Sequence, residues 1–292
     1  MTTDPKTPQA WGNFLAKLWG PQFPVEADRV ALDYTARRFS DCPIGKIGTH
    51  DVDGFEGMLI ERPEKKCWYI LLDKRVSLPG RTNFTIAHEL GHFLMHRAQE
   101  NDFRCNQRAV LDYGSGESKK REQEANIFAS YLLMPMNDFR EQVGANPISF
   151  DLLEHCADRY RTSLTATILK WLEFTGEAGV LIVAREGFVL WSKPSTNARK
   201  HGFYFPSGTA IPERSRAAVA STFRHEDRAG VLVPRGVWHP SEPVCEMLIV
   251  SDRYDFTISL IVASGLNLRA DHDEPEPDDA VDHIMQAFER EN

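Results

Sequence analysis

The sequence lacks any apolar run of the kind that crosses a membrane. None of its hydrophobic stretches approaches the roughly 18 consecutive apolar residues that a transmembrane helix requires. Its first residues, MTTDPKTPQAWGNF, also lack the basic start and apolar stretch of a secretory signal. We therefore expect a chain with no membrane-spanning segment and no signal peptide.

Cysteine is sparse, and acidic residues outnumber basic ones. The cysteines number five and include no CxxC pair, namely Cys42, Cys67, Cys105, Cys156 and Cys245. This usage favours reduced thiols and a cytoplasmic location over a disulfide framework. The net charge of -8 argues against a nucleic-acid footprint over the whole chain, although a local basic patch stays compatible with it.

The length and composition are those of a globular α+β protein with more than one domain. The chain has 292 residues, of which 42% are hydrophobic and 26% are charged. Shifts in composition and pattern predict five consecutive parts. These are an N-terminal arm over 1–24, a first domain over 25–142, a helical segment over 143–177, a second α+β module over 178–268 and an acidic tail over 269–292.

The first domain is expected to combine helices with a small sheet. The arm should dock through its aromatic residues, and PVEADRVALDYTARRF has the spacing of a helix after Pro24. The stretch FEGMLIERPEKKCWYILLDKRV predicts a β-hairpin, whose second strand could offer its edge to an extended peptide. A loop, SLPGRTN, then leads to a helix that should begin near Phe84, capped by Thr82 or Asn83.

The rest of the chain alternates loops, helices and strands. Residues 101–120 have the composition of a surface loop, and REQEANIFASYLLM predicts a helix that ends at Pro135. Residues 147–174 indicate a helix, a short turn and a second helix. The stretches VLIVAREGFVLW and CEMLIVSDRYDFTISLIVAS each predict two strands joined by a turn.

The stretch RTNFTIAHELGHFLMHR contains the pattern H-E-x-x-H. His88 and His92 lie four residues apart, so on a helix both can point their imidazoles at one ion. Glu89 is rotated by about 100° from His88 and can reach a water on that ion as a general base. Zinc suits this arrangement, and Mn²⁺ or Fe²⁺ also fit. The competing interpretation is a helix with histidines that bind no metal.

A catalytic zinc needs a third protein ligand, and His96 is a poor candidate. It continues the four-residue spacing but lies about 12 Å from His88 along the helix axis. We therefore expect His96 to support the site from outside the coordination sphere or to be structural. The longer metzincin pattern would place a third histidine at Ala98, so that pattern is absent.

The stretch KKREQEANIFASYLLMP offers two glutamates instead. Glu122 is favoured over Glu124 as the ligand, because small residues on its helix face would let this helix press against Gly91. Those small residues are Ala125, Asn126 and Ala129. The alternative for both glutamates is an ordinary helix start, where acidic residues favour the helix dipole.

These two blocks together resemble a known family. RTNFTIAHELGHFLMH followed by EQEANIFASYLLMP is similar to the ImmA/IrrE metallopeptidases, over roughly residues 25–140. The resemblance implies a small gluzincin-like zinc peptidase domain, with a short twisted sheet against the motif helix and the ligand helix. It also implies that His88, His92 and Glu122 bind zinc and that Glu89 is the catalytic base.

The resemblance further implies a substrate. Members of that family act on helix-turn-helix (XRE-type) transcriptional repressors, cleaving or inactivating them and so derepressing stress, DNA-damage or mobile-element genes. Some carry a helix-turn-helix-like segment and then a sensor-like domain. Residues 147–174 and 178–268 could correspond to these, with a GAF-like fold for the latter by analogy.

Two other functions compete with the peptidase. One is a non-proteolytic regulatory protein that binds a helix-turn-helix partner, as an antirepressor or toxin–antitoxin component, and an intact Glu89 counts against it. The other is direct DNA binding through Arg159, Arg161 and Lys170, against which a packed helical linker is favoured. For the peptidase, Tyr131, His96 and Asn126 are candidates for donors to the oxyanion or for residues that support the metal ligands.

Overall fold

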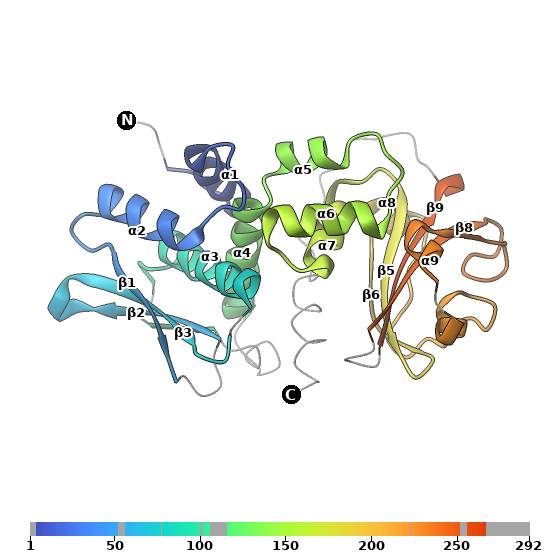
Figure 1. The fold of residues 1–292 in the computed structure, drawn as a ribbon. Coiled ribbons are helices and arrows are strands. Elements are labelled where there is room, and N and C mark those ends of the chain that lie inside the picture. The colour runs from blue at the N-terminus through green and yellow to red at the C-terminus, as the bar shows by residue number, and fades with distance from the viewer. Residues whose placement is uncertain are drawn as a thin grey trace. The chain divides into compact units, whose positions relative to one another are not determined.

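The structure is a computed structural model, in which the described chain forms two compact units (Figure 1). The first unit comprises Met1–Gly144 with Ala157–Ser163, and the second comprises Ala145–Cys156 with Leu164–Asn292. The chain therefore passes from one unit to the other at three places, after Gly144, after Cys156 and after Ser163, and the second of these lies within a helix. The structure describes residues 4–51, 56–76, 78–99, 102–105, 116–222, 224–251 and 256–266.

The first unit contains a four-stranded sheet with the strand order β1-β3-β2-β4. Strand β3 runs parallel to β1 and antiparallel to β2, and β2 runs antiparallel to β4. The strands are β1 Ile44–His50, β2 Gly57–Arg62, β3 Cys67–Asp73 and β4 Asp102–Cys105.

The predicted hairpin is present as β2 and β3. Its turn is a short 3₁₀ helix, η1 (Pro63–Lys65), followed by Lys66 in the left-handed conformation with φ 51°. The prediction that its second strand offers a free edge is wrong, because β3 pairs with β1 on one side and with β2 on the other. Within the described sheet, the outer strands are β1 and β4.

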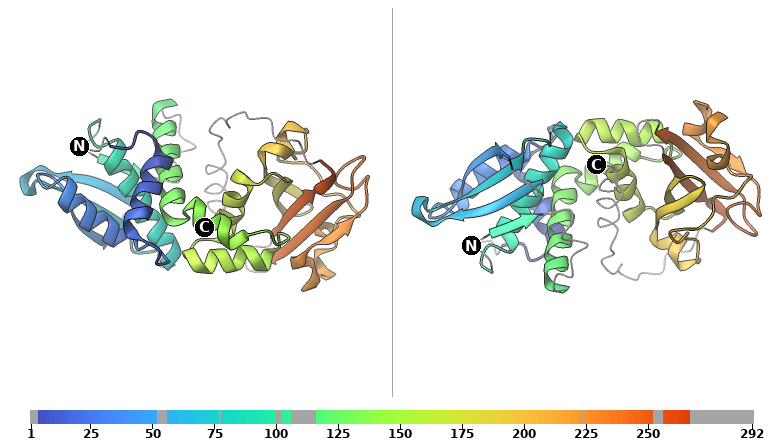
Figure 2. Two further views of the ribbon diagram at one scale, coloured as in Figure 1. Left: turned by 90° about the horizontal axis from the view of Figure 1, so that it is seen from above. Right: turned by 90° about the horizontal axis from the view of Figure 1, so that it is seen from below.

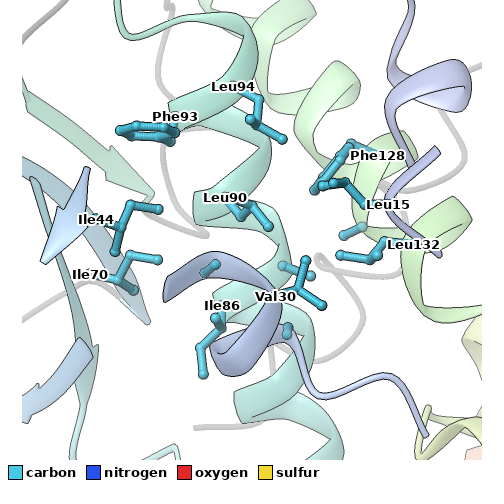
Figure 3. Packing of buried hydrophobic residues seen from close by; sticks show 14 of the residues in the cluster. Leu15, Val30, Ile44, Ile70, Ile86, Leu90, Phe93, Leu94, Phe128 and Leu132 are labelled. Atoms are coloured by element: carbon cyan, nitrogen blue, oxygen red, sulfur yellow. The ribbon is translucent and has the colours of Figure 1, made fainter. Parts of the chain in front are cut away.

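Helix α3 (Pro79–Met95) forms the centre of this unit and is apolar on most of its surface. Figure 3 shows its residue Leu90 between the sheet residues Ile44 and Ile70 on one side and Phe128 and Leu132 on the other. The latter two belong to α4 (Gly116–Leu133), and all five side chains are buried in one core. The motif helix is thus fixed from two sides.

Helix α3 begins at Pro79, earlier than predicted, and has no side-chain cap. Proline in the first turn has a φ angle suited to a helix and needs no N–H partner there. The expected cap, Asn83, serves another helix: its Oδ1 accepts from Ala27 N and its Nδ2 donates to Val25 O, both at 2.8 Å. Thr82 donates to Val76 O at 3.3 Å.

The predicted N-terminal arm is an α-helix, α1 (Pro8–Trp19), and the predicted helix after Pro24 is α2 (Ala27–Arg38). Trp11 is buried, as docking through aromatic residues requires, whereas Leu18 is 60% exposed. Helix α1 lies against α4 in both views of Figure 2. A Cβ on Gly12 would lie 2.6 Å from Tyr131 Cβ, so only glycine permits this approach.

The predicted surface loop over 101–120 is wrong at both of its ends. Residues Asp102–Cys105 form β4, and α4 already begins at Gly116. The residues between them lie outside the described part of the chain. After α4, a short helix, α5 (Met136–Val143), was not predicted.

The second unit contains the two predicted strand pairs in one antiparallel sheet, with the order β6-β5-β9-β8-β7. The predicted helices over 147–174 are also present, as α6 (Phe150–Tyr160) and α7 (Leu164–Phe174). The acidic tail lies outside the described residues. The further elements are β5 Ala178–Arg185, β6 Phe188–Pro194, α8 Thr196–Lys200, η3 Ala217–Thr222, α9 Glu226–Ala229, β7 Val231–Val233, β8 Val244–Ser251, β9 Phe256–Ala263 and η4 Ser264–Leu266.

No helix in the described part of the chain is both long enough and apolar enough to span a membrane.

Candidate metal centre

The two motif histidines converge on α3. They are one helical turn apart, and the Nε2 atoms of His88 and His92 are 3.0 Å from each other. Both side chains are buried, since His88 is 5% exposed and His92 is 0% exposed. The pattern therefore places two imidazole nitrogens at one buried point.

Glu122 on α4 faces the same point. Its Oε2 lies 3.2 Å from His88 Nε2, and its Oε1 lies 3.3 Å from His92 Nε2. Ligand atoms bound to one tetrahedral zinc at about 2.0–2.1 Å lie about 3.3 Å from one another. The group of His88, His92 and Glu122 therefore fits a metal ion without rearrangement of its ligand atoms.

Small residues let α4 come close enough to supply this ligand. A Cβ on Gly91 would lie 3.0 Å from Phe128 Cδ1 and 3.2 Å from Ala125 Cα, so the two helix backbones nearly touch there. This is the approach that the small face of α4 predicts. Glu124 points elsewhere, and it does not belong to the group of converging ligand atoms.

The electrostatics of the cluster favour a bound cation. Burial would raise the pKa of the Glu122 carboxyl, but hydrogen bonds with His88 and His92 hold it well below its usual range. Burial lowers the pKa of the His92 imidazole to about 4. Burial would also lower the pKa of His88, yet its contacts with Glu122 raise it above the ordinary value. At neutral pH, Glu122 is therefore anionic and His92 is neutral, as metal ligands must be.

Both histidines are held by a second contact at Nδ1. His88 Nδ1 lies 2.9 Å from Asn126 Oδ1, and His92 Nδ1 lies 3.0 Å from His96 Nδ1. His96 is buried in turn, and its Nε2 lies 2.9 Å from Glu124 Oε2. Metal-binding histidines commonly use their second nitrogen in this way, which fixes the ring orientation.

Glu89 follows His88 on α3 and is 0% exposed. It lies against the start of β2, where a Cβ on Gly57 would be 2.6 Å from Glu89 Oε1 and 2.5 Å from Thr85 Cγ2. The absence of a side chain at Gly57 leaves room for the carboxylate. Nothing in the sequence alone pointed to Gly57, because it precedes the motif by some thirty residues and meets it only in the folded sheet.

The structure places two of the candidates for a donor to the oxyanion in other contacts. Tyr131 lies on the face of α4 that packs against α1, next to Gly12. Both ring nitrogens of His96 are occupied, one by His92 and the other by Glu124. Asn126 lies at the cluster, with its amide oxygen at His88.

Two of the three basic residues considered for DNA binding, on α6, α7 and the turn between them, are engaged with carboxylates. Arg159 forms a bidentate pair with Asp138 at 2.8 and 2.9 Å, and the pKa of its guanidinium is raised by that hydrogen bonding. Lys170 is buried, with its Nζ 3.3 Å from Glu173 Oε2. Only Arg161 of the three is exposed.

Comparisons with known proteins agree with this geometry. Residues 50–171 match the family model Peptidase_M78, described as the IrrE N-terminal-like domain. The solved structure of a Mycobacterium tuberculosis transcriptional regulator is similar, with a TM-score of 0.55 and 16% identity over 88% of this chain and 76% of that chain. At such low identity, this likeness shows the fold alone. No curated protein matches the sequence at a significant level.

The family match confirms the resemblance drawn from the two sequence blocks. It includes both the motif helix and the helix of the third candidate ligand. Residues 50–171 of this chain therefore match the IrrE N-terminal-like domain of the Peptidase_M78 family, and this segment contains the candidate metal ligands His88, His92 and Glu122.

Proposed function

We propose that the protein is a zinc-dependent endopeptidase that cleaves a helix-turn-helix (XRE-type) transcriptional repressor and thereby derepresses genes. The observation that carries the hydrolytic part is the convergence of His88, His92 and Glu122, with Glu89 next to them on α3. The repressor is proposed from the resemblance to the ImmA/IrrE family. The cytoplasmic location follows from the same substrate.

The proposed chemistry is hydrolysis by an activated water. A metal held by the three ligands would polarise a carbonyl and lower the pKa of a bound water toward about 7. Glu89 accepts a proton from the attacking water and passes it to the leaving amine. Asn126 and His96 hold the two imidazoles in place, and the buried setting strengthens each electrostatic contact. Zinc is the proposed metal, and Mn²⁺ or Fe²⁺ are alternatives for the same ligands.

We assign the peptidase role to residues 25–142 and a sensing role to the module over 178–268. The module is proposed to be GAF-like, and its five-stranded antiparallel sheet is compatible with this. Direct DNA binding is not part of the proposal, because Arg159 and Lys170 are engaged with carboxylates.

The test compares the protein with its Glu89→Gln variant. Each is loaded with zinc and incubated with the helix-turn-helix repressor encoded nearest to its gene. We expect about one zinc per chain in both, and cleavage slower by about 10²–10⁴-fold in the variant. A Glu117→Gln variant, changed at an exposed acid on α4, is the matched control and should cleave normally.

Three results would separate the alternatives. Zinc in both proteins with no cleavage by either, and a stable complex with the repressor, would replace the peptidase by a partner-binding regulator. Equal cleavage by both proteins would refute the role of Glu89 as the catalytic base. Absence of zinc from both would refute the proposed metal site.

A further inference from the structure

A row of side chains leads from the candidate ligand His92 to the surface of α4. His92 Nδ1 and His96 Nδ1 are 3.0 Å apart, and His96 Nε2 is 2.9 Å from Glu124 Oε2. His92 and His96 are buried, whereas the Glu124 side chain is 31% exposed. The same helix that supplies Glu122 to the cluster thus supplies a second glutamate behind it.

The direction of these hydrogen bonds follows from the protons that are available. If His92 binds a metal through Nε2, its remaining proton is on Nδ1, which then acts as a donor. The acceptor in this contact is His96 Nδ1, which must therefore carry no proton. The proton of neutral His96 is then on Nε2, and there it donates to the Glu124 carboxylate. Only one tautomer of His96 is compatible with both contacts.

We propose that Glu124 and His96 act together as positioning residues for His92. Glu124 selects the Nε2–H tautomer of His96, and that tautomer presents the acceptor that holds the His92 ring with Nε2 toward the metal. This rests on the proposed metal site. Glu124 is thereby neither a third ligand nor an ordinary acidic residue at a helix start.

The other ligand provides an internal comparison. His88 donates to Asn126 Oδ1, a neutral amide oxygen that needs no further residue to act as an acceptor. An imidazole nitrogen accepts only in one of its tautomers, so the contact behind His92 depends on a further residue. This predicts that the support of His92 can be weakened from Glu124, two contacts away.

The first measurement is zinc affinity, by competition with a chelator, in Glu124→Ala, His96→Ala and the double variant. Loss of a residue that supports a ligand commonly weakens metal binding by 10–100-fold. We expect each single variant to lose affinity by about this factor and the double variant to be no weaker than His96→Ala. Glu117→Ala, which removes an exposed acid from the first turn of α4, should bind zinc as the parent does. Additive losses, or unchanged affinity in Glu124→Ala, would refute the pairing.

The second measurement needs no activity. In protein saturated with zinc and labelled with ¹⁵N-histidine, NMR correlation of ring nitrogens with ring protons reports which nitrogen of His96 carries the proton. We expect the Nε2–H form in the parent protein and a loss of that preference in Glu124→Ala. A parent protein with His96 in the Nδ1–H form would overturn the inference.

The two measurements also separate this inference from the proposed function. Normal zinc binding by all variants would refute the positioning role of Glu124 and His96 but would not contradict the proposed peptidase activity. A parent protein that binds zinc and shows the tautomer preference and its dependence on Glu124, but cleaves no repressor, would refute the peptidase and leave the positioning role.

Discussion

Two glutamates, the half-buried Glu122 and the buried Glu246, one in each unit, show how the same side chain can be used in different ways. Glu246 on β8 accepts from Arg216 N and Ala217 N, both at 2.9 Å, and from the Trp238 indole at 2.7 Å. Glu122 on α4 meets two imidazole nitrogens instead. The partners of Glu246 are N–H groups that keep their protons, whereas those of Glu122 can give theirs up.

The pKa shifts of the two carboxyls follow this difference. Burial raises the pKa of Glu246 despite the donors around it, while the two histidines hold that of Glu122 well below its usual range. Glu246 is satisfied within the protein and anchors the start of η3 to the sheet. Glu122 belongs to a group whose atoms converge on a space that a cation can fill. The identity of the partner therefore separates a structural carboxylate from a candidate ligand.

The largest effects on zinc content and stability should come from replacing Glu122 or Glu246 by alanine in separate variants. Glu122→Ala removes one of three ligands and should bring the zinc content close to zero at micromolar metal. Glu246→Ala should leave zinc binding unchanged but lower the free energy of unfolding by about 1–3 kcal/mol for each buried donor left without a partner. Metal analysis and chemical denaturation of both variants test this. Loss of zinc from Glu246→Ala would contradict a purely structural role for Glu246.

A smaller effect is expected at a third carboxylate, the buried Glu89. In Gly57→Ala, the new methyl group would displace the Glu89 carboxylate or the Thr85 side chain, and a misplacement of about 1 Å can cost on the order of 100-fold in rate. Zinc affinity should stay within a few-fold, because Gly57 does not touch a ligand. Gly48→Ala is the control, since the nearest atom to its Cβ is 3.6 Å away. Peptidase assays on both variants test whether Gly57→Ala, and not Gly48→Ala, slows cleavage.

The pH dependence of zinc binding should also follow the cluster. His88 must be neutral to bind zinc, and its contacts with Glu122 raise its pKa above the ordinary value of 6.5. Glu122 is already ionised, and His92 is neutral down to about pH 4, so a single proton competes with zinc in this range. Zinc affinity should therefore fall about tenfold per pH unit below the pKa of His88 and level off above it. A twofold steeper slope in a chelator titration would show that a second group takes part.

The smallest effect concerns the approach of the two helices. A methyl group at Gly91 would lie 3.0 Å from Phe128 Cδ1, so Gly91→Ala should cost about 1–3 kcal/mol of stability through overpacking. A slight shift of α4 should weaken zinc binding by several-fold. Gly116→Ala adds a methyl group with no atom within 4 Å and should be neutral. Equal behaviour of the two variants would mean that α4 is not held by this contact.

The sequence was most informative where a pattern of residues depends on a single helix. The spacing of His88 and His92 and the small face next to Glu122 depend only on helical periodicity, and the structure brings these three residues together. The role of Asn83 could not be read in this way, because it caps a helix 56 residues earlier in the chain. The contact of Glu124 with His96 likewise depends on how two helices pack.

Sheet pairing was harder to predict than the helices. The segment Ile44–His50 contains two glycines and has mostly exposed or half-exposed residues, so its alternation was too weak to indicate a strand. Because it pairs with β3, the strand that was expected to be free is an inner one. The prediction of a free edge failed because local propensity does not determine the position of a strand in the sheet.

The contact between α1 and α4 has a consequence for where this domain can be cut. The family match begins at residue 50, after α1, α2 and nearly all of β1. Yet Trp11, Leu15 and Val30 belong to the same core as Phe128 and Leu132. A shortened chain that starts at residue 50 would leave that side of α4 open to water. The stretch that marks the family is thus smaller than the stretch that must fold together.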